Sequence, residues 1–306
     1  MKKQINQETF FSALKVSEES IKTCLRVFYG FLFFEFLIDI VPDMTIVWRS
    51  QPSINYLGIF SLVELIPLRA LLVIGLVSGW LGLIGQVINP FNRWTQVLSF
   101  LYVFVYHCVE FGETGVAHEI LPYFWVSLIV CFMPHIPRSR KFTRVEQLQA
   151  FYVYRSMLLI PCFFFFGAGF WKIYYGLVEG NLFSINALSA HIAIFYNGVG
   201  WIGPLGKYLL ENPVLGYIGY ITVIVFEVTA LLNLVFPRLN RPWILMIFTF
   251  VMANYFIFEI EFFRYLFLCA VIFYFSPLRL FVSRRENIRV FPKIFSVFFK
   301  KINDFK

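Results

Sequence analysis

The stretch Gly167-Ala168-Gly169-Phe170-Trp171-Lys172-Ile173 closes a hydrophobic run that begins near Phe151. A lysine therefore lies close to one end of a segment long enough to cross a bilayer, which takes about 20 apolar residues. A charge at depth in a membrane helix costs about 2.5–3.5 kcal/mol on insertion scales, so it needs a partner, a water-filled cavity or a chemical role. Two interpretations stay open. Lys172 is a catalytic base, or its stem lies along Trp171 and Tyr175 while its ammonium group reaches the interface.

The composition around this stretch is that of an integral membrane protein. Hydrophobic residues make up 59% of the 306 residues and charged residues only 14%, whereas soluble domains carry about 25% charged residues. We therefore predict an all-α membrane protein. The net charge of +8 is expected in loops and tails, where it sets orientation and attracts membrane lipid. No soluble region is large enough for nucleic-acid binding.

The hydrophobic runs predict about eight transmembrane helices in one bundle, with short interfacial helices between them. We expect the first span to end before Pro42, and Pro67 and the glycine-rich 75–85 segment to kink or break the long second span. The connection 176–212 is the only long one between spans. The eight predicted spans cover residues 22–41, 57–88, 94–110, 117–136, 151–175, 213–236, 243–258 and 262–279.

The charge pattern predicts both the orientation and the division of the chain. One side receives most lysines and arginines, and the other receives mainly glutamates, so both termini are predicted to be cytoplasmic, which means the plasma membrane in a bacterium. Residues 1–20 are expected to form a cytoplasmic surface segment, 21–282 the multi-pass membrane domain, and 283–306 a basic amphipathic cytoplasmic tail. Lys172 and His118 then share the outer half.

Cysteines and histidines give no sign of a disulfide framework or a metal site. The five cysteines are odd in number and contain no C-x-x-C pair, so we expect buried, inert thiols. The four histidines lack ligand spacing, so no metal is predicted. Any mechanism therefore has to come from the membrane helices themselves.

Glu227 lies in the middle of the sixth predicted span, where a carboxylate is expensive and should face the bundle interior. We expect Glu227 and Arg26 to be buried charges. Glu227 is expected to pair with Arg26, Arg155 or a polar side chain of a neighbouring helix as a structural contact. A proton-relay role is the alternative.

Ala168-Gly169-x-x-Lys172-Ile173, followed by Val178-Glu179-Gly180, resembles the signature of HTTM membrane domains. That family includes the membrane half of vitamin K-dependent γ-carboxylase. The resemblance covers about residues 20–280 and is most specific around Lys172. Further similar segments are the run Leu25-Arg26-Val27-Phe28-Tyr29-Gly30-Phe31-Leu32, Tyr102-Val103-Phe104, and Asn254 with Ile257-Phe258-Glu259-Ile260-Glu261.

The resemblance implies a mechanism. In the carboxylase a motif lysine acts as a base on reduced vitamin K, and oxygenation yields a strong base that removes a proton from a peptide glutamate. A motif histidine assists capture of carbon dioxide. Carried over by position, Lys172 would be the base and His118 its helper, with a reduced, vitamin K-like quinone as cofactor. The supporting motif positions would be Gly169, Trp171, Glu179, Gly180, Asn254 and Glu259.

The resemblance also leaves two function classes. The carboxylase carries a large lumenal domain that this chain is expected to lack, so the length is more similar to stand-alone bacterial relatives of the sporulation-delaying protein B type. The first class is a membrane enzyme that uses a lipid-soluble quinol on a peptide or small substrate. The second is a non-enzymatic helper in the maturation or export of a secreted, toxin-like peptide.

Overall fold

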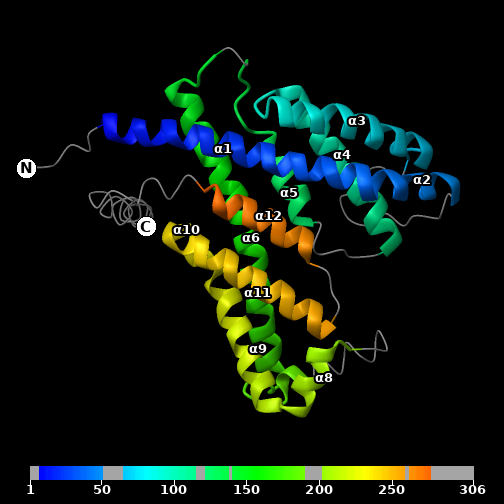
Figure 1. The fold of residues 1–306 in the computed structure, drawn as a ribbon, viewed down its shortest axis with the longest axis vertical. Coiled ribbons are helices and arrows are strands. Elements are labelled where there is room, and N and C mark those ends of the chain that lie inside the picture. The colour runs from blue at the N-terminus through cyan, green and yellow to red at the C-terminus, as the bar shows by residue number, and fades with distance from the viewer. Residues whose placement is uncertain are drawn as a thin grey trace, which may run out of the picture.

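The computed structural model describes residues 7–50, 65–114, 121–137, 140–189, 202–258 and 262–276, and within these ranges all regular structure is helical (Figure 1). This confirms the all-α prediction. The elements are α1 Gln7–Glu35, a π-helix Phe36–Ile40, α2 Val41–Ser50, α3 Leu68–Ile88, α4 Arg93–Thr114, α5 Leu121–Val130, α6 Arg144–Val178, α8 Pro204–Glu211, α9 Pro213–Val228, a 3₁₀ turn Thr229–Leu231, α10 Leu232–Val235, a 3₁₀ turn Pro237–Leu239, α11 Asn240–Phe258 and α12 Phe263–Tyr274.

Four of the described helical segments are long and apolar enough to cross a membrane, as a membrane protein requires. They are Leu68–Ile88, Arg144–Val178, Pro213–Val235 and Asn240–Phe258. Two further apolar helices, α5 and α12, are shorter. The predicted spans 57–88, 117–136 and 262–279 lie partly outside the described residues. The helices that contain the predicted spans 22–41 and 94–110 are fully described but are not among the four. The count of eight spans stays a prediction.

One expected helix end is absent. Helical structure is continuous from Gln7 through the π-helix and past Pro42 into α2. The prediction that the first helix ends before Pro42 is therefore wrong. Pro42 is tolerated because it lies in the first turn of α2, after a π-helical segment that already alters the hydrogen-bond ladder.

Pro67 does break the second run, since α3 begins immediately after it, but the glycine-rich 75–85 segment is continuous helix. Its glycines allow α3 to lie close to α4. A Cβ atom added to Gly82 would be 2.5 Å from the backbone nitrogen of Ser99. The glycines therefore allow a short distance between the two helices.

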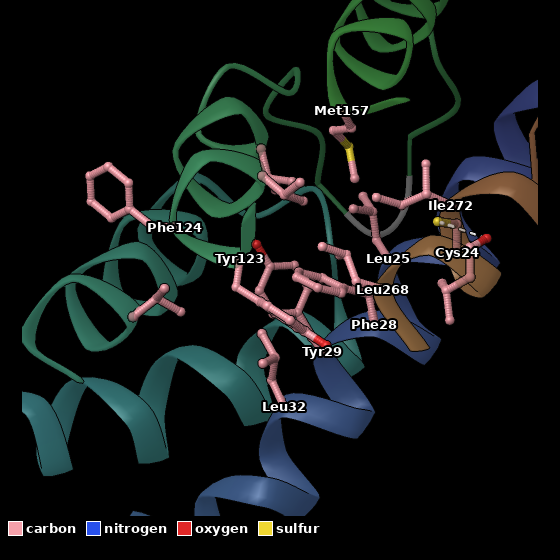
Figure 2. Close-up of a cluster of buried hydrophobic side chains, with 14 of the residues drawn as sticks. Cys24, Leu25, Phe28, Tyr29, Leu32, Tyr123, Phe124, Met157, Leu268 and Ile272 are labelled. Atoms are coloured by element: carbon pink, nitrogen blue, oxygen red, sulfur yellow. Dashed lines mark hydrogen bonds between the residues drawn. The ribbon is translucent and has the colours of Figure 1, made fainter. Parts of the chain in front are cut away.

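The largest core cluster joins α1, α5, α6 and α12, as Figure 2 shows. Phe28 of α1 stacks on Tyr123 of α5 with ring centroids 5.8 Å apart. The Cys24 thiol donates to the Val271 carbonyl of α12 at 3.9 Å. All five cysteines are free and four are buried, as expected for inert thiols.

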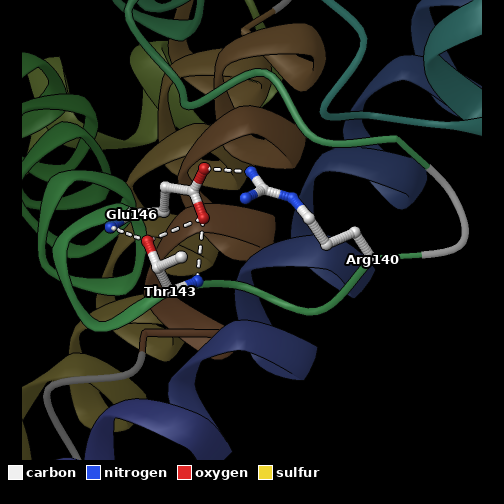
Figure 3. A network of polar contacts seen from close by, with 3 residues as sticks. All are labelled: Arg140, Thr143 and Glu146. Atoms are coloured by element: carbon white, nitrogen blue, oxygen red, sulfur yellow. Dashed lines mark hydrogen bonds and ion pairs between the residues drawn. The ribbon is translucent and has the colours of Figure 1, made fainter.

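The start of α6 is fixed by a capping box at Thr143 (Figure 3). The backbone nitrogen of Glu146 donates to the Thr143 hydroxyl at 3.3 Å, and the backbone nitrogen of Thr143 donates to the Glu146 carboxylate at 2.8 Å. Arg140 pairs with the other oxygen of the same carboxylate. These contacts satisfy donors that a helix end leaves unpaired, so α6 begins earlier than the predicted span at 151.

α6 is the longest described helix, at 35 residues, and connects two parts of the molecule. Its first part packs against α1 and α5, and its last part lies along α9, towards the end of the molecule where α8 is found (Figure 1). The motif around Lys172 lies in this last part. Its position between α6 and α9 decides what Lys172 contacts.

Candidate functional site

Lys172 of α6 and Glu227 of α9 form a salt bridge that uses both carboxylate oxygens. The ammonium nitrogen Nζ is 2.5 Å from Oε1 and 2.7 Å from Oε2. The Glu227 side chain is only 1% exposed, while that of Lys172 is 30% exposed. Lys172 therefore connects a buried carboxylate with the surface of the helical body.

Gly169 explains why these two side chains can meet. It is buried one turn before Lys172, and a Cβ atom there would be 2.7 Å from the Glu227 Cβ and 2.9 Å from the Val228 backbone nitrogen. Real Cβ atoms do not approach so closely, so only glycine allows α9 to come this near. The motif glycine thus has a direct steric role in forming the pair.

Aromatic rings pack around Phe226, the residue directly before the buried Glu227. The ring of Phe226 stacks on Trp243 of α11 at 4.2 Å between centroids. Phe165 of α6 contacts both rings edge-on, at 5.3 and 5.5 Å. Such apolar surroundings make an unpaired carboxylate costly, so the salt bridge with Lys172 compensates the buried charge of Glu227.

The other motif positions within the described residues make contacts of their own. Trp171 is 57% exposed and packs edge-on against Tyr175. Glu179 is exposed and accepts a hydrogen bond from the Asn181 amide at 3.1 Å. Gly180 has φ +70° just after the end of α6, a conformation that favours glycine. Asn254 donates to the Phe250 carbonyl of its own helix at 2.8 Å.

Two predicted site residues, His118 and Glu259, lie outside the described residues. The described site therefore includes neither of them. Of the motif positions that the structure describes, it brings together Lys172 and Gly169 with Glu227, and places Trp171, Glu179, Gly180 and Asn254 elsewhere on α6, its C-terminal turn and α11.

The expectation that Arg26 is a buried charge is wrong. Arg26 is exposed on α1 and donates to the Ile88 carbonyl of α3 at 3.3 Å. The core face of α1 is occupied by Leu25, Phe28 and Tyr29, so Arg26 falls on the outer face. Glu227 is buried as expected, and its partner is Lys172 of the neighbouring helix α6, a polar side chain that the prediction allowed but did not name.

A second ion pair, which the sequence reasoning missed, joins α1 and α12. Arg264 Nε is 3.1 Å from Glu35 Oε1, and another Arg264 nitrogen donates to the Tyr106 hydroxyl of α4 at 3.0 Å. The Tyr123 hydroxyl of α5 donates to the Arg264 backbone carbonyl. Glu35 also ends the α-helical part of α1, directly before the π-helix. In the sequence, the only sign of this pair is that Glu35 and Arg264 carry opposite charges within two different apolar runs.

Within the described ranges no group of His, Cys, Asp and Glu side chains has the arrangement of a metal site. The chemistry that the Lys172–Glu227 pair itself offers is proton exchange between an amine and a carboxylate in apolar surroundings. No protein-family model matches the chain, and no curated protein or solved structure matches it significantly.

Proposed function

We propose that this chain is an HTTM-type, multi-pass membrane enzyme in which Lys172 and Glu227 act together as a proton-transfer pair on a lipid-soluble substrate. The observation that carries the proposal is the salt bridge of 2.5 and 2.7 Å to a carboxylate that is 1% exposed. The proposal includes eight spans, both termini in the cytoplasm and a reduced, vitamin K-like quinone as cofactor.

The pairing changes how Lys172 would act as a base. In the salt bridge Lys172 is an ammonium group, and an ammonium group cannot accept a further proton. If the proton moves to Glu227, a neutral amine and a neutral acid result, and apolar surroundings penalise that state less than they penalise charges. Lys172 would then take a proton from the quinol, while Glu227 holds the one that Lys172 released.

Access to the pair comes from the lysine side. Because the Lys172 side chain is 30% exposed and Glu227 is buried, a quinol dissolved in the surrounding lipid would reach the amine first. His118 would assist a later step, as the resemblance implies. A reduced quinone, when bound, would supply the oxygen-dependent base that acts on a peptide or small substrate.

The second candidate is a non-enzymatic helper for a secreted, toxin-like peptide. The observation in its favour is a group of exposed aromatic side chains at the end of α6, Trp171, Tyr174 and Tyr175, which are 57%, 49% and 41% exposed. Aromatic residues supply contact area at peptide interfaces, although they also mark membrane–water boundaries. In this reading the ion pair only holds α6 to α9.

The test uses the purified chain in lipid nanodiscs with a reduced naphthoquinone, oxygen and carbon dioxide. Oxygen-dependent loss of the quinol is followed by absorbance. Lys172→Ala and Lys172→Arg should both abolish it, because arginine preserves the salt bridge but does not release its proton. Lys207→Ala, which removes an exposed lysine of α8, is the matched control. Activity that survives in Lys172→Arg would exclude the lysine as a base.

The same variants separate the two candidates. For a helper, Lys172→Arg should retain export or maturation of the peptide, since the contact between α6 and α9 persists. Substitution of Trp171 and Tyr175 by alanine should then be the damaging change. For the enzyme, these aromatic variants should keep quinol oxidation.

A further inference from the structure

A groove of about 880 Å³ lies between α1, α11 and α12, away from the Lys172–Glu227 pair. Neither residue of that pair lines it. Its walls are mainly apolar, and they include Phe31 of α1, Ile244 and Phe248 of α11, and Phe267 of α12. The volume falls within the about 300–1,000 Å³ typical of small-molecule sites.

Arg241 lines one end of the groove. Its guanidinium carbon lies 6.0 Å from the ring centroid of Tyr274, which lines the groove from α12. Among the described residues Arg241 forms no salt bridge. The apolar segment Asn240–Phe258 begins one residue before it, so Arg241 lies where a membrane span meets the headgroup region.

Glu35 and Arg264 also line the groove. They are joined to each other at 3.1 Å, and Arg264 is held in addition by Tyr106 at 3.0 Å. One glutamate and two arginines leave one net positive charge, and that charge is at Arg241. The groove therefore offers a single cationic anchor for an anion and an apolar path beyond it.

The apolar path covers most of one membrane leaflet. Beyond Arg264, the lining residues of α12 run from Leu266 to Tyr274, which at 1.5 Å per residue is about 12 Å. A bilayer hydrocarbon core is about 30 Å thick, so one leaflet is about 15 Å. An acyl chain of a membrane lipid thus fits along most of its length.

We propose that this groove binds a phospholipid with an anionic headgroup, whose phosphate pairs with Arg241 and whose acyl chain lies against Phe31, Phe248 and Phe267. Arginine matches phosphate because its planar guanidinium donates two parallel hydrogen bonds. The site rests on the membrane placement in the proposed function, but not on the chemistry of Lys172.

The experiment measures lipid binding to the delipidated full chain in detergent by native mass spectrometry. The probes are phosphatidylglycerol, phosphatidylcholine with the same acyl chains, and free oleate. Phosphatidylglycerol should form a one-to-one adduct that is bound more tightly than the other two. Arg241→Ala and Arg241→Gln should each weaken it about tenfold, whereas Arg238→Ala, which removes an exposed charge at the same end of α11, should not.

A second variant tests the apolar part. Ala270→Phe places a ring in the groove and should reduce binding of both phospholipids without changing the preference between them. Three results would each overturn the proposal. They are equal affinity for phosphatidylglycerol and phosphatidylcholine, equal effects of the Arg241 and Arg238 substitutions, and tighter binding of oleate. Lys172→Arg should bind the lipid normally, so failure of quinol chemistry and failure of this site give different results.

Discussion

The two buried ion pairs within the described residues differ in how their charged side chains are held. Glu227 has Lys172 as its hydrogen-bond partner, and the contact joins α6 and α9. Glu35 pairs with Arg264, which also donates to Tyr106, so that cluster joins α1, α4 and α12. The side chain of Glu227 is 1% exposed and that of Glu35 is 10% exposed.

This difference indicates which of the two pairs is suited to proton transfer. Arginine keeps its proton in proteins and its fork of donors suits a fixed network, so the Glu35–Arg264 cluster is a permanent structural contact. Lysine, unlike arginine, is able to lose its proton in apolar surroundings, and Lys172 binds both oxygens of the Glu227 carboxylate directly. One pair therefore fixes helices, and the other has the lysine that the proposed proton transfer requires.

The largest expected effect comes from removing one partner of the more buried pair. Lys172→Met leaves Glu227 uncompensated and should lower the free energy of unfolding by about 3–5 kcal/mol. The double variant Lys172→Met with Glu227→Gln should recover most of that loss, because no buried charge remains. Denaturant unfolding in detergent measures both. A double variant as unstable as the single one would show that the pair is not an isolated unit.

A smaller effect is expected at the glycine that brings α9 close to α6. Gly169→Ala should destabilise the fold by about 1–3 kcal/mol, because the added Cβ overlaps Glu227 and Val228. Gly167→Ala on the same helix meets nothing within 4 Å and should stabilise it by about 0.5–1 kcal/mol. In denaturant unfolding, Gly169→Ala should therefore lower the unfolding midpoint and Gly167→Ala should raise it.

Glu35→Gln should cost less than breaking the Lys172 pair. Arg264 keeps its contact with Tyr106 and is 28% exposed, so its charge is partly solvated after the change. We expect about 1–2 kcal/mol of destabilisation. The same unfolding assay compares the two pairs directly, and a Glu35→Gln loss as large as that of Lys172→Met would remove the distinction drawn above.

The smallest effect is expected at the far end of α6. Thr143→Ala removes the capping hydroxyl and should cost about 1 kcal/mol. Hydrogen exchange should increase in the first turn after Thr143 and remain unchanged around Lys172. Thr222→Ala, which removes a hydroxyl that only contacts its own helix at Ile218, is the control. Faster exchange at Lys172 would mean that the cap also controls the site.

Composition alone predicted an all-helical chain with membrane-spanning segments, because apolar runs of this length have few other solutions. The cost of a carboxylate in a span also predicted that Glu227 is buried. Its pairing with Lys172 could not be derived, since the two residues are 55 positions apart and a run of apolar residues does not tell which faces of two helices meet. The same limit explains the error at Arg26.

The glycines of 75–85 show a related limit. A glycine in a helical run is equally consistent with a bend and with a close neighbour, and only the position of α4 decides between them. Pro42 was misread for a similar reason. Its effect depends on whether the preceding turn already departs from α-helical geometry, and that departure is not visible in residue types.

The π-helical segment Phe36–Ile40 has one more consequence. A wider turn accommodates an additional residue, so the side chains of α2 are rotated relative to the pattern that α1 would continue. Deleting one residue between 36 and 40 should turn all of α2 by about 100° about the common axis. Met44, which now packs near Gly75 of α3, would then turn away from it. The short π-helical segment therefore determines which side chains of α2 face α3.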